Sequence, residues 1–555
     1  MKALILANMG GVHYSGSDIV PSCFLKLYND MTILDRQISL LNLNGFPGNN
    51  ICVVCGTEGI WTKKEVKDKI QSLDVKIAYS PADNEFNGGA LDWAFFEDDD
   101  VLIIEGNHII DIAIISRLKR YHCRDVMVVD DVLDPDDAKQ LIKIAGDDVV
   151  SIRNSDLIEF PWVTFAGIMK MSCESFRDLI SASTHSRPLL EAINEILPKR
   201  TFKAVKYDDL IYGRINGGLS DELTGGSYSK LNYRLVVKKQ CDNEGRAKLV
   251  NEIKWLLSIP PELKPYFSQI LEYDIDSPNA FYNVPYYGKR NLREHIFDGH
   301  LDADAACRFL DGLLTWMFRN VYSRKIGDTP DGWVMEKHIN RVLGRLPECE
   351  RKSPEFARII EADRVIINGK EYRNVRELYT RLSKMDDFLE RVKPKAMVMI
   401  HGDLHFQNII LTNETDTGFI LVDPRGESEG SDVYYDLGKV WHSFHAKYDF
   451  IHSDQFEYEM EWKDGVPHAK FRITNTFVEK VYDDIYAKFQ KIIVNYDYIR
   501  NDPDWEMKIL FAEASHLCSV SVFHIDKTEK PDRAIVMYLI GVQLINEFFD
   551  RYIKG

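Results

Sequence analysis

Long hydrophobic runs are missing from this sequence. The apolar stretch from Val101 to Ile115 is interrupted by polar and charged residues, so it does not have the character of a transmembrane helix. A secretory signal is missing as well, because only five apolar residues separate Lys2 from Asn8. We therefore expect a cytoplasmic protein that does not insert into membranes.

Paired cysteines are also missing. The nine cysteines are scattered, and Cys52 and Cys55 have the C-x-x-C spacing without a second pair to accompany them. Both lie in an apolar run that is typical of a buried strand. Buried thiols are therefore the expected interpretation, rather than a zinc or redox site.

Basic residues are fewer than acidic residues. The chain has 69 Lys and Arg residues against 86 Asp and Glu residues, which gives a net charge of −17. Such a surface repels nucleic acids and anionic membranes, so small molecules are the expected partners, and oligomerisation stays open. At 555 residues the chain is too long for one ordinary core, and two or three domains are expected.

One stretch combines polar and apolar segments in a distinctive order. It reads His401-Gly402-Asp403-Leu404-His405-Phe406-Gln407-Asn408, between apolar runs at 397–400 and 409–411. A turn-forming patch at 412–418 separates the second run from a third at 419–422. This order predicts a polar loop, a strand hairpin, and an aspartate, Asp423, directly after the second strand.

The same order suits phosphoryl transfer. Asp403 and Asn408 have the D-x-x-x-x-N spacing of kinase catalytic loops, in which the aspartate accepts the proton of the substrate hydroxyl. Asn408 and Asp423 offer the hard oxygen ligands that Mg²⁺ prefers beside the phosphates of ATP. We therefore expect ATP and Mg²⁺ as cofactors. In the competing interpretation, these are ordinary loop and capping residues. That interpretation explains a single motif more easily than the whole combination of motifs.

The constellation H-G-D-L-H-x-x-N, followed by V-D, resembles the aminoglycoside phosphotransferase and choline kinase family. The resemblance implies a two-lobed, protein-kinase-like phosphotransferase domain. It also implies that Asp436, in the stretch Gly430 to Lys439, braces the catalytic loop through hydrogen bonds, with His401 as a further supporting residue.

The lysine that holds the ATP phosphates is expected upstream. Lys238 closes a strand that begins at Tyr233, and Glu252 in the next helix is expected to steady it. Lys239 takes this place if the strand register differs by one residue, because successive residues face opposite ways.

Two further segments complete the expected ATP site. Backbone groups near Val284 and Tyr286 are expected to bind adenine at the hinge between the lobes. The turn that covers the phosphates is predicted at Gly225, Gly226 and Ser227.

Helical periodicity extends from Leu301 to Leu389, with one hairpin predicted at 364–372 around an Asn-Gly turn. This region is expected to form the acceptor site. Its aromatic residues either cage a quaternary ammonium group or belong to the core. The candidates are Trp316, Tyr322 and Trp333. The chain after Lys439 is expected to be helical through Phe549.

Strands and helices alternate near the start of the chain. Strands are expected at 2–7, 51–54, 75–78 and 101–107, with helices near 33–41 and 63–73. This alternation predicts a parallel sheet with helices on both faces, whose ligands bind outside the carboxyl ends of the strands.

This layout over roughly the first 210 residues resembles the sugar-phosphate and phosphocholine nucleotidyltransferases, which implies a doubly wound domain of the GT-A type. In this resemblance, Ser22 stands where the family has a lysine, and Asn107 stands where it has a metal-binding aspartate. The first loop also lacks the arginine of the family. Asp209 is the candidate second metal ligand, with Asp208 as its neighbour, or else a helix cap. Fewer counter-charges favour a degenerate domain.

The sequence thus predicts an α/β domain at 1–213, followed by an α+β kinase domain with lobes at 214–287 and 288–555. The expected function is an ATP- and Mg²⁺-dependent kinase that phosphorylates a hydroxyl of a sugar, polyol or choline-like amino alcohol. Its pathway is expected to be capsule or surface polysaccharide precursor synthesis. The alternatives are a bifunctional enzyme with both domains active and a non-catalytic scaffold that only binds ligands.

Overall fold

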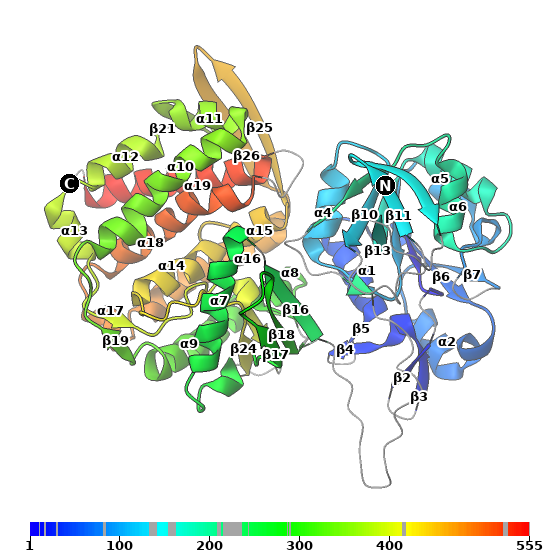
Figure 1. The fold of residues 1–555 in the computed structure, drawn as a ribbon, viewed down its shortest axis with the longest axis horizontal. Coiled ribbons are helices and arrows are strands. Elements are labelled where there is room, and N and C mark those ends of the chain that lie inside the picture. Colours follow the sequence, from blue (N-terminus) through cyan, green and yellow to red (C-terminus); the bar gives the residue numbers. More distant parts are fainter. Residues whose placement is uncertain are drawn as a thin grey trace, which may run out of the picture. The chain divides into compact units, whose positions relative to one another are not determined.

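The computed structural model describes residues 1–9, 12–15, 18–28, 31–81, 85–131, 141–153, 162–207, 213–214, 236–241, 243–285, 287, 290–412, 418–525 and 531–553. The chain forms two compact units, Met1–Leu231 and Asn232–Gly555, and each combines helices with strands (Figure 1). Strand β15 (Gly213–Arg214) pairs with β9 (His108–Ile109) inside the first unit. The finer division at residues 213 and 287 stays a prediction. The described helices include none that is long and apolar enough to span a bilayer.

A nine-stranded sheet forms the centre of the first unit. Its order is β10-β14-β12-β11-β13-β8-β1-β6-β7. The strands of one half run parallel, as the sequence predicts: β1 (Lys2–Leu6), β6 (Ile51–Gly56), β7 (Lys76–Ser80) and β8 (Val101–Glu105). The other half contains β10 (Val126–Asp131), β11 (Leu141–Ala145), β12 (Asp148–Arg153), β13 (Trp162–Met171) and β14 (Lys203–Val205).

The sheet is mixed, which corrects the prediction of a parallel sheet. Strand β13 runs antiparallel to its neighbour β8, because the regular alternation of strand and helix ends after α4. In the described part of this unit, the α-helices beside the sheet are α1 (Ile33–Leu43), α2 (Lys64–Gln71), α3 (Trp93–Phe96), α4 (Ile112–Arg120), α5 (Cys173–Ala182) and α6 (Leu189–Ile196). Short strand pairs are formed by β2 (Val12–Ser15) with β3 (Asp18–Pro21) and by β4 (Lys26–Tyr28) with β5 (Met31–Thr32).

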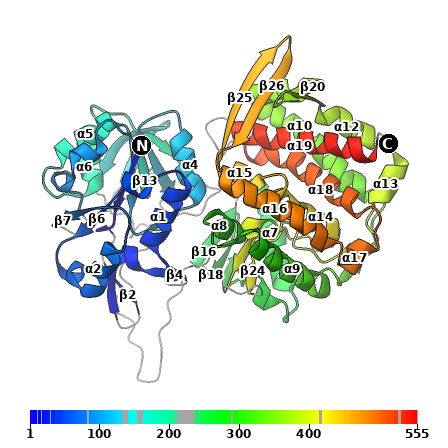
Figure 2. The ribbon, with the colours of Figure 1, turned by 180° about the vertical axis from the view of Figure 1, so that it is seen from behind.

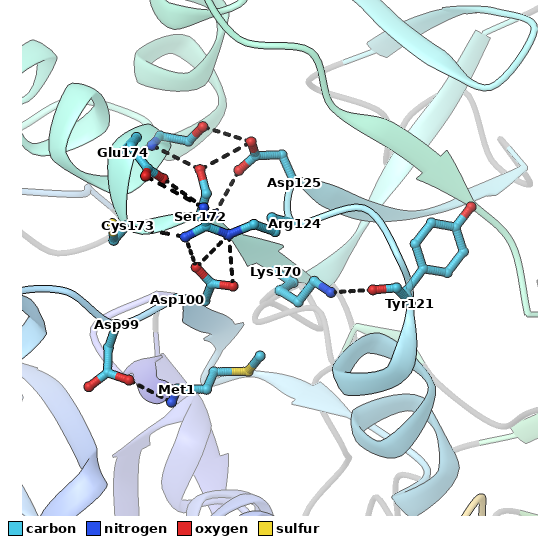
Figure 3. Close-up of polar contacts among 11 residues, drawn as sticks. Met1, Asp99, Asp100, Tyr121, Arg124, Asp125, Lys170, Ser172, Cys173 and Glu174 are labelled. Atoms are coloured by element: carbon cyan, nitrogen blue, oxygen red, sulfur yellow. Dashed lines mark hydrogen bonds and ion pairs between the residues drawn. The ribbon is translucent and has the colours of Figure 1, made fainter. Parts of the chain in front are cut away.

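A polar network anchors the beginning of α5 (Figure 3). The Asp125 carboxylate accepts hydrogen bonds from the Ser172 backbone N–H (2.7 Å) and from the Ser175 hydroxyl (2.9 Å). Beside it, Arg124 forms an ion pair with Asp100 over 2.5 Å. Because Ser172 is also the N-cap of α5, these contacts satisfy helix donors and fix the segment before β10. We therefore assign the network a stabilising role.

The second unit begins with a three-stranded sheet of order β16-β18-β17. Its strands are β16 (Val236–Cys241), β17 (Glu272–Asp274) and β18 (Ala280–Pro285). Helix α7 (Asn243–Ser258) packs beside β16 and β18 (Figures 1 and 2). Short apolar runs later form the two-stranded hairpin of β23 (Ile409–Leu411) and β24 (Phe419–Leu421), which confirms the hairpin predicted after the stretch His401 to Asn408.

Helices make up most of the rest of this unit. Helices α14 (Val433–Phe444), α18 (Trp505–Val520) and α19 (Asp532–Tyr552) lie side by side (Figure 2). The remaining helices are α8 (Leu292–Phe297), α9 (Ala303–Asn320), the π-helix η7 (Met335–Asn340), α10 (Arg341–Lys352), α11 (Pro354–Glu361), α12 (Val375–Leu382), α13 (Asp386–Val392), α15 (Tyr448–His452), α16 (Thr476–Ile493) and α17 (Asp497–Arg500).

A four-stranded sheet adds to the predicted hairpin. Strands β20 (Arg364–Ile367) and β21 (Lys370–Arg373) are joined by Asn368 and Gly369, whose φ angles are +50° and +84°, which confirms the Asn-Gly turn. An unpredicted hairpin of β25 (Phe456–Lys463) and β26 (Val466–Ile473) pairs with β20. The expectation of a wholly helical chain after Lys439 is therefore wrong. A further short pair consists of β19 (Lys325–Gly327) and β22 (Met397–Val398).

Candidate active site

One carboxylate, that of Asp436, anchors the loop that contains Asp403. Asp436, in the first turn of α14, accepts hydrogen bonds from the backbone N–H groups of His401 (2.8 Å) and Gly402 (2.7 Å). The Tyr322 hydroxyl donates a third bond to it over 3.2 Å. Burial raises the pKa of Asp436 to about 7, although these donors oppose the rise. Two adjacent peptide groups of the loop are thereby fixed by a single helix residue.

The His401 ring joins the two halves of the motif. Its Nδ1 accepts a hydrogen bond from the Asp403 backbone N–H (3.2 Å), and its Nε2 lies 3.0 Å from the Val422 carbonyl oxygen. An accepting Nδ1 requires the neutral ring with the proton on Nε2. Burial lowers the pKa of His401 to about 4, which favours the same neutral form. His401 therefore holds the backbone of Asp403 beside the residue that precedes Asp423.

The side chain of Asp403 lies close to a buried cation. Lys439 Nζ is 2.9 Å from Asp403 Oδ1, and His405 Nε2 is 3.8 Å from Oδ2. Burial raises the pKa of Asp403, but Lys439 and His405 outweigh it and hold the pKa well below its usual range. The carboxylate is therefore ionised at neutral pH. Lys439 was not among the predicted site residues, although it follows Asp436 by three positions.

The Asn408 side chain faces the same loop. Its Nδ2 donates to the Asp403 carbonyl oxygen over 2.9 Å, and the Asn408 carbonyl accepts from the Val422 N–H over 3.0 Å. The first bond fixes which end of the amide is the nitrogen. It thereby leaves the amide oxygen Oδ1 for another ligand.

Asp423 has an unusual backbone conformation. Its φ angle is +57°, in the left-handed region that few residues other than glycine adopt. Such strain occurs often at functional sites, where the surrounding structure holds it in place. The Asp423 carboxylate contacts Lys239. Burial raises the pKa of Asp423, but the charge of Lys239 outweighs this and lowers it overall.

The strand lysine in this site is Lys239. Its Nζ lies 2.9 and 2.8 Å from the two carboxylate oxygens of Glu252, and it also contacts Asp423. The Tyr282 hydroxyl completes the surroundings of Glu252 with a bond of 2.5 Å. Burial and the charge of Asp423 raise the pKa of Glu252 to about 7. One lysine thus joins the helix glutamate to the aspartate of the motif.

The expected pairing of Lys238 with Glu252 is corrected by this geometry. Lys238 Nζ lies 4.4 Å from the centre of the Phe281 ring, on the other face of the strand. Side chains alternate along a strand, and β16 continues to Cys241 rather than closing at residue 238. Lys239, the alternative one residue later, therefore faces α7.

Two glycines allow the segments of this site to approach closely. A Cβ atom on Gly402, at φ +84°, would lie 2.6 Å from Arg425 Cβ. A Cβ atom on Gly426, at φ +77°, would lie 2.6 Å from the backbone nitrogen of Glu252. Only glycine fits both the conformation and the space at these positions.

Other predicted site residues are placed only in part. Val284 lies near the end of β18 and pairs with Val237. Five candidates lie outside the described residues: Gly225, Gly226, Ser227, Tyr286 and Asp209. The three aromatic candidates, for a cage or for the core, each pack on another ring: Trp316 on Tyr266 and Phe419, Tyr322 on Phe318, and Trp333 on His338.

The donor set suits Mg²⁺. Asn408 offers an amide oxygen and Asp423 a carboxylate, the hard ligands that this ion takes together with phosphate oxygens. In the described part of the chain, no group of three or more His, Cys, Asp or Glu residues is arranged to hold a metal. A cation bound here would therefore rely on these two side chains and on oxygens of the nucleotide.

In the first unit, Asn107 follows β8 and is fully buried. Its Oδ1 lies 2.9 Å from His108 Nδ1, which in turn lies 3.4 Å from the Glu105 carboxylate. Gly106 packs against the backbone of Ala7 after β1, since a Cβ atom there would lie 2.7 Å from Ala7 Cα. The carboxyl ends of β1 and β8 therefore lie in close contact, and the Asn107 side chain there lies beside His108.

Two surface cavities lie away from these residues. One, of about 570 Å³, is lined by α11 and α12 residues such as Ile360 and Arg376. The other, of about 920 Å³, lies beside β26 and α19 and is lined by residues such as Arg472 and Glu547. Neither contains a predicted site residue.

No protein-family model matches this chain. No curated protein matches it either. Two solved structures with similarity are HddC from Yersinia pseudotuberculosis, at 16% identity, and the same protein complexed with GMP-PN, at 14% identity. The similarities cover 38% and 39% of this chain and 92% and 93% of those chains, at TM-scores of 0.29 and 0.27. Scores of this size establish neither a shared function nor a family.

Proposed function

We propose that the second unit is a small-molecule kinase that uses ATP and Mg²⁺ to phosphorylate a hydroxyl group. The observation that supports this most directly is the contact of Lys239 with both Glu252 and Asp423. A strand lysine paired with a helix glutamate, beside an aspartate that follows a hairpin, is the arrangement that kinases use around the ATP phosphates. His401 connects this group to the loop of Asp403.

In this proposal the nucleotide phosphates bind beside Lys239. The ammonium group pairs with phosphate oxygens, while Glu252 keeps the lysine in position. Asn408 and Asp423 would hold Mg²⁺, which would supply positive charge to neutralise the phosphates. Positioning and electrostatic stabilisation are the main contributions that a protein makes to phosphoryl transfer.

Asp403 receives and orients the acceptor hydroxyl. A bond forms between the hydroxyl oxygen and the γ-phosphorus, and the bond from the γ-phosphorus to the bridging oxygen breaks. ADP leaves with that electron pair, and the hydroxyl proton passes to Asp403. A carboxylate with a low pKa is a weak base, so its role in orienting the hydroxyl matters more than its basicity.

The product is a phosphorylated sugar, polyol or amino alcohol. A cytoplasmic enzyme of this kind would supply precursors for capsule or surface polysaccharides. A non-catalytic scaffold would not require the three features that occur together here, namely an ionised Asp403, an oriented Asn408 amide and a strained Asp423.

The test uses ATP labelled at the γ-phosphate and a panel of sugars, polyols and amino alcohols with Mg²⁺. We expect label transfer to an acceptor, with a loss of at least about a hundredfold for Asp403→Ala. Transfer that survives Asp403→Ala would overturn the assignment. Mg²⁺-dependent stabilisation by ATP in a thermal-shift assay, weakened in Asp423→Asn, tests the nucleotide site separately.

For the first unit we propose a nucleotidyltransferase-like domain that binds a ligand at the carboxyl ends of β1 and β8. The close approach of these strand ends and the buried Asn107 support a site there. Because Asn107 replaces a carboxylate that a metal would need, we propose that this domain is degenerate. Release of pyrophosphate from any nucleoside triphosphate, lost in Asp209→Ala, would instead make the protein bifunctional.

A further inference from the structure

Four cationic side chains gather around Tyr435, and we refer to them as the basic cluster: Lys337, Arg341, Arg345 and Arg425. The Tyr435 hydroxyl accepts a hydrogen bond from Arg425 Nη1 over 2.6 Å and another from Arg341. Lys337 Nζ lies 4.7 Å from the centre of the Tyr435 ring. Arg345 is close enough that the charges of Arg341 and Arg425 act on its pKa.

Negative charge within the cluster is scarce. Glu427 is shared by two members, with its Oε1 at 2.7 Å from both Lys337 Nζ and Arg425 Nε. Arg341 bonds to the Tyr435 phenol, and Arg345 donates to the Ser519 carbonyl oxygen over 2.8 Å. Among the described residues, the ion pairs within the cluster therefore set four cations against one shared carboxylate, in a chain whose net charge is −17.

The other ionisable groups around the cluster leave it with an excess of positive charge. Burial, together with Arg341 and Lys337, lowers the pKa of His338 to about 3, so this ring is neutral. Glu348, whose charge also acts on Arg345, lies 3.7 Å from Lys352. Burial raises the pKa of Tyr435, but the surrounding cations lower it to about 8. The cations around the phenol thus favour its anionic form.

The basic cluster lies directly beside the catalytic loop. The Arg425 N–H donates to the His401 carbonyl oxygen over 2.9 Å. The space next to Gly402 is filled by Arg425 and Glu427, whose Cγ would lie 3.5 Å from a Cβ atom on that glycine. Asp403 follows in the chain, and its charge acts on Arg425. A ligand on the cluster would therefore lie near the proposed catalytic aspartate.

The helix that carries Lys337 has a rare geometry. Residues Met335–Asn340 form a π-helix directly before α10. Short π-helical segments are uncommon and are found frequently at functional sites. Here the segment brings Lys337 to Glu427 and to the Tyr435 ring, while the next turn brings Arg341 to the phenol.

We propose that the acceptor carries an anionic group, a phosphate or a carboxylate, and that the basic cluster binds this group while Asp403 receives the hydroxyl. Guanidinium groups bind such planar or tetrahedral anions through paired hydrogen bonds, and they do so best where water is partly excluded. Lys337 and Arg425 have side chains that are only 15% and 27% exposed. The enzyme then selects anionic alcohols over neutral sugars and over cations such as choline. This inference depends on the proposed kinase function.

The first test measures anion binding without requiring the natural acceptor. Protein saturated with Mg²⁺ and AMP-PNP is titrated with inorganic phosphate in a calorimeter, so that the γ-phosphate position is already filled. We expect one phosphate site. The double variant Lys337→Gln/Arg341→Gln should weaken it at least tenfold, whereas Arg472→Gln, which removes an exposed cation on β26, should leave it unchanged. Absent phosphate binding, or equal binding by the double variant, would overturn the inference.

The second test separates the two anions and separates this inference from the kinase assignment. Mannose 6-phosphate and gluconate are compared with mannose as competitors of bound phosphate. Displacement by the phosphate ester alone or by the carboxylate alone identifies the group, and displacement by mannose as effectively as by either anion contradicts the proposal. If AMP-PNP fails to bind in the presence of Mg²⁺, the kinase function itself fails. If it binds and phosphate does not, only the anionic acceptor is refuted.

Discussion

Lys439 Nζ lies 2.9 Å from Asp403 Oδ1, and its side chain is only 8% exposed. This buried cation keeps the proposed catalytic carboxylate ionised, because it outweighs the effect of burial on the pKa of Asp403. The pair connects α14 to the loop that the same helix already supports through Asp436.

Replacing Lys439 by Met should raise the pKa of Asp403. The folded protein would then bind a proton at higher pH, so the acid limb of kcat/KM should move to higher pH by about one unit or more. Breaking a buried pair should also cost about 3 to 5 kcal/mol of stability, measured by urea unfolding. Lys439→Arg retains the charge and should keep the acid limb near that of the wild type. An unshifted limb in Lys439→Met would show that Lys439 does not control Asp403.

Lys239 and Lys238 are neighbours that should differ sharply in function. Lys239→Ala removes the cation shared by Glu252 and Asp423, so we expect kcat/KM for ATP to fall by about a hundredfold or more. Lys238→Ala removes only a contact with the Phe281 ring and should change the rate less than about threefold. Steady-state kinetics of both variants test this difference. Equal losses of kcat/KM in the two variants would contradict the strand register described here.

Gly402 and Gly465 have similar backbone conformations in different surroundings. Their φ angles are +84° and +77°, yet a Cβ atom would contact Arg425 at 2.6 Å at the first position and no atom within 4 Å at the second. Gly465→Ala should cost about 1 kcal/mol through conformational strain alone. Gly402→Ala adds a steric clash and should cost more, with a clear loss of kinase activity. Thermal unfolding of both variants provides the comparison.

Tyr435 should titrate well below an ordinary tyrosine. Its folded-state pKa of about 8 lies below the unfolded value near 10, so the phenolate is favoured by folding. The resulting stability is present above pH 10 and is lost as the pH falls through about 8. Absorbance at 295 nm, taken as the difference between wild type and Tyr435→Phe, should show one group titrating near pH 8. Arg341→Gln should move this titration upward, because it removes a cation that stabilises the phenolate.

Local sequence patterns predicted much of the second unit. Asp403, Asn408 and Asp423 lie within 21 residues, and short apolar runs between them were enough to predict the hairpin that brings them together. The spacing from Asp403 to Asn408 fits within one loop. Strand register was harder to predict, since a shift of one residue exchanged Lys238 for Lys239.

Other features had a signal that the prediction did not use. Residues Phe456–Lys463 alternate between apolar and polar side chains, which is typical of a strand with one face buried. The mixed sheet of the first unit had a weaker signal. Strand β13 pairs antiparallel with β8, although β9, α4, β10, β11 and β12 lie between them in the chain, and no local pattern specifies that partner.

The sequence by itself determined the chemistry of the motif: a carboxylate, an amide and a second carboxylate at fixed spacing, since chain connectivity and apolar patterning place such residues around one hairpin. The tertiary structure alone decided which charged side chains lie near the residues of this motif. Lys439 reaches Asp403 from α14, and the basic cluster joins residues 337, 341, 345 and 425 around Tyr435, because helix packing brings together side chains that are distant in the chain. Electrostatic interactions depend on distance and burial in space, and one-dimensional spacing specifies neither.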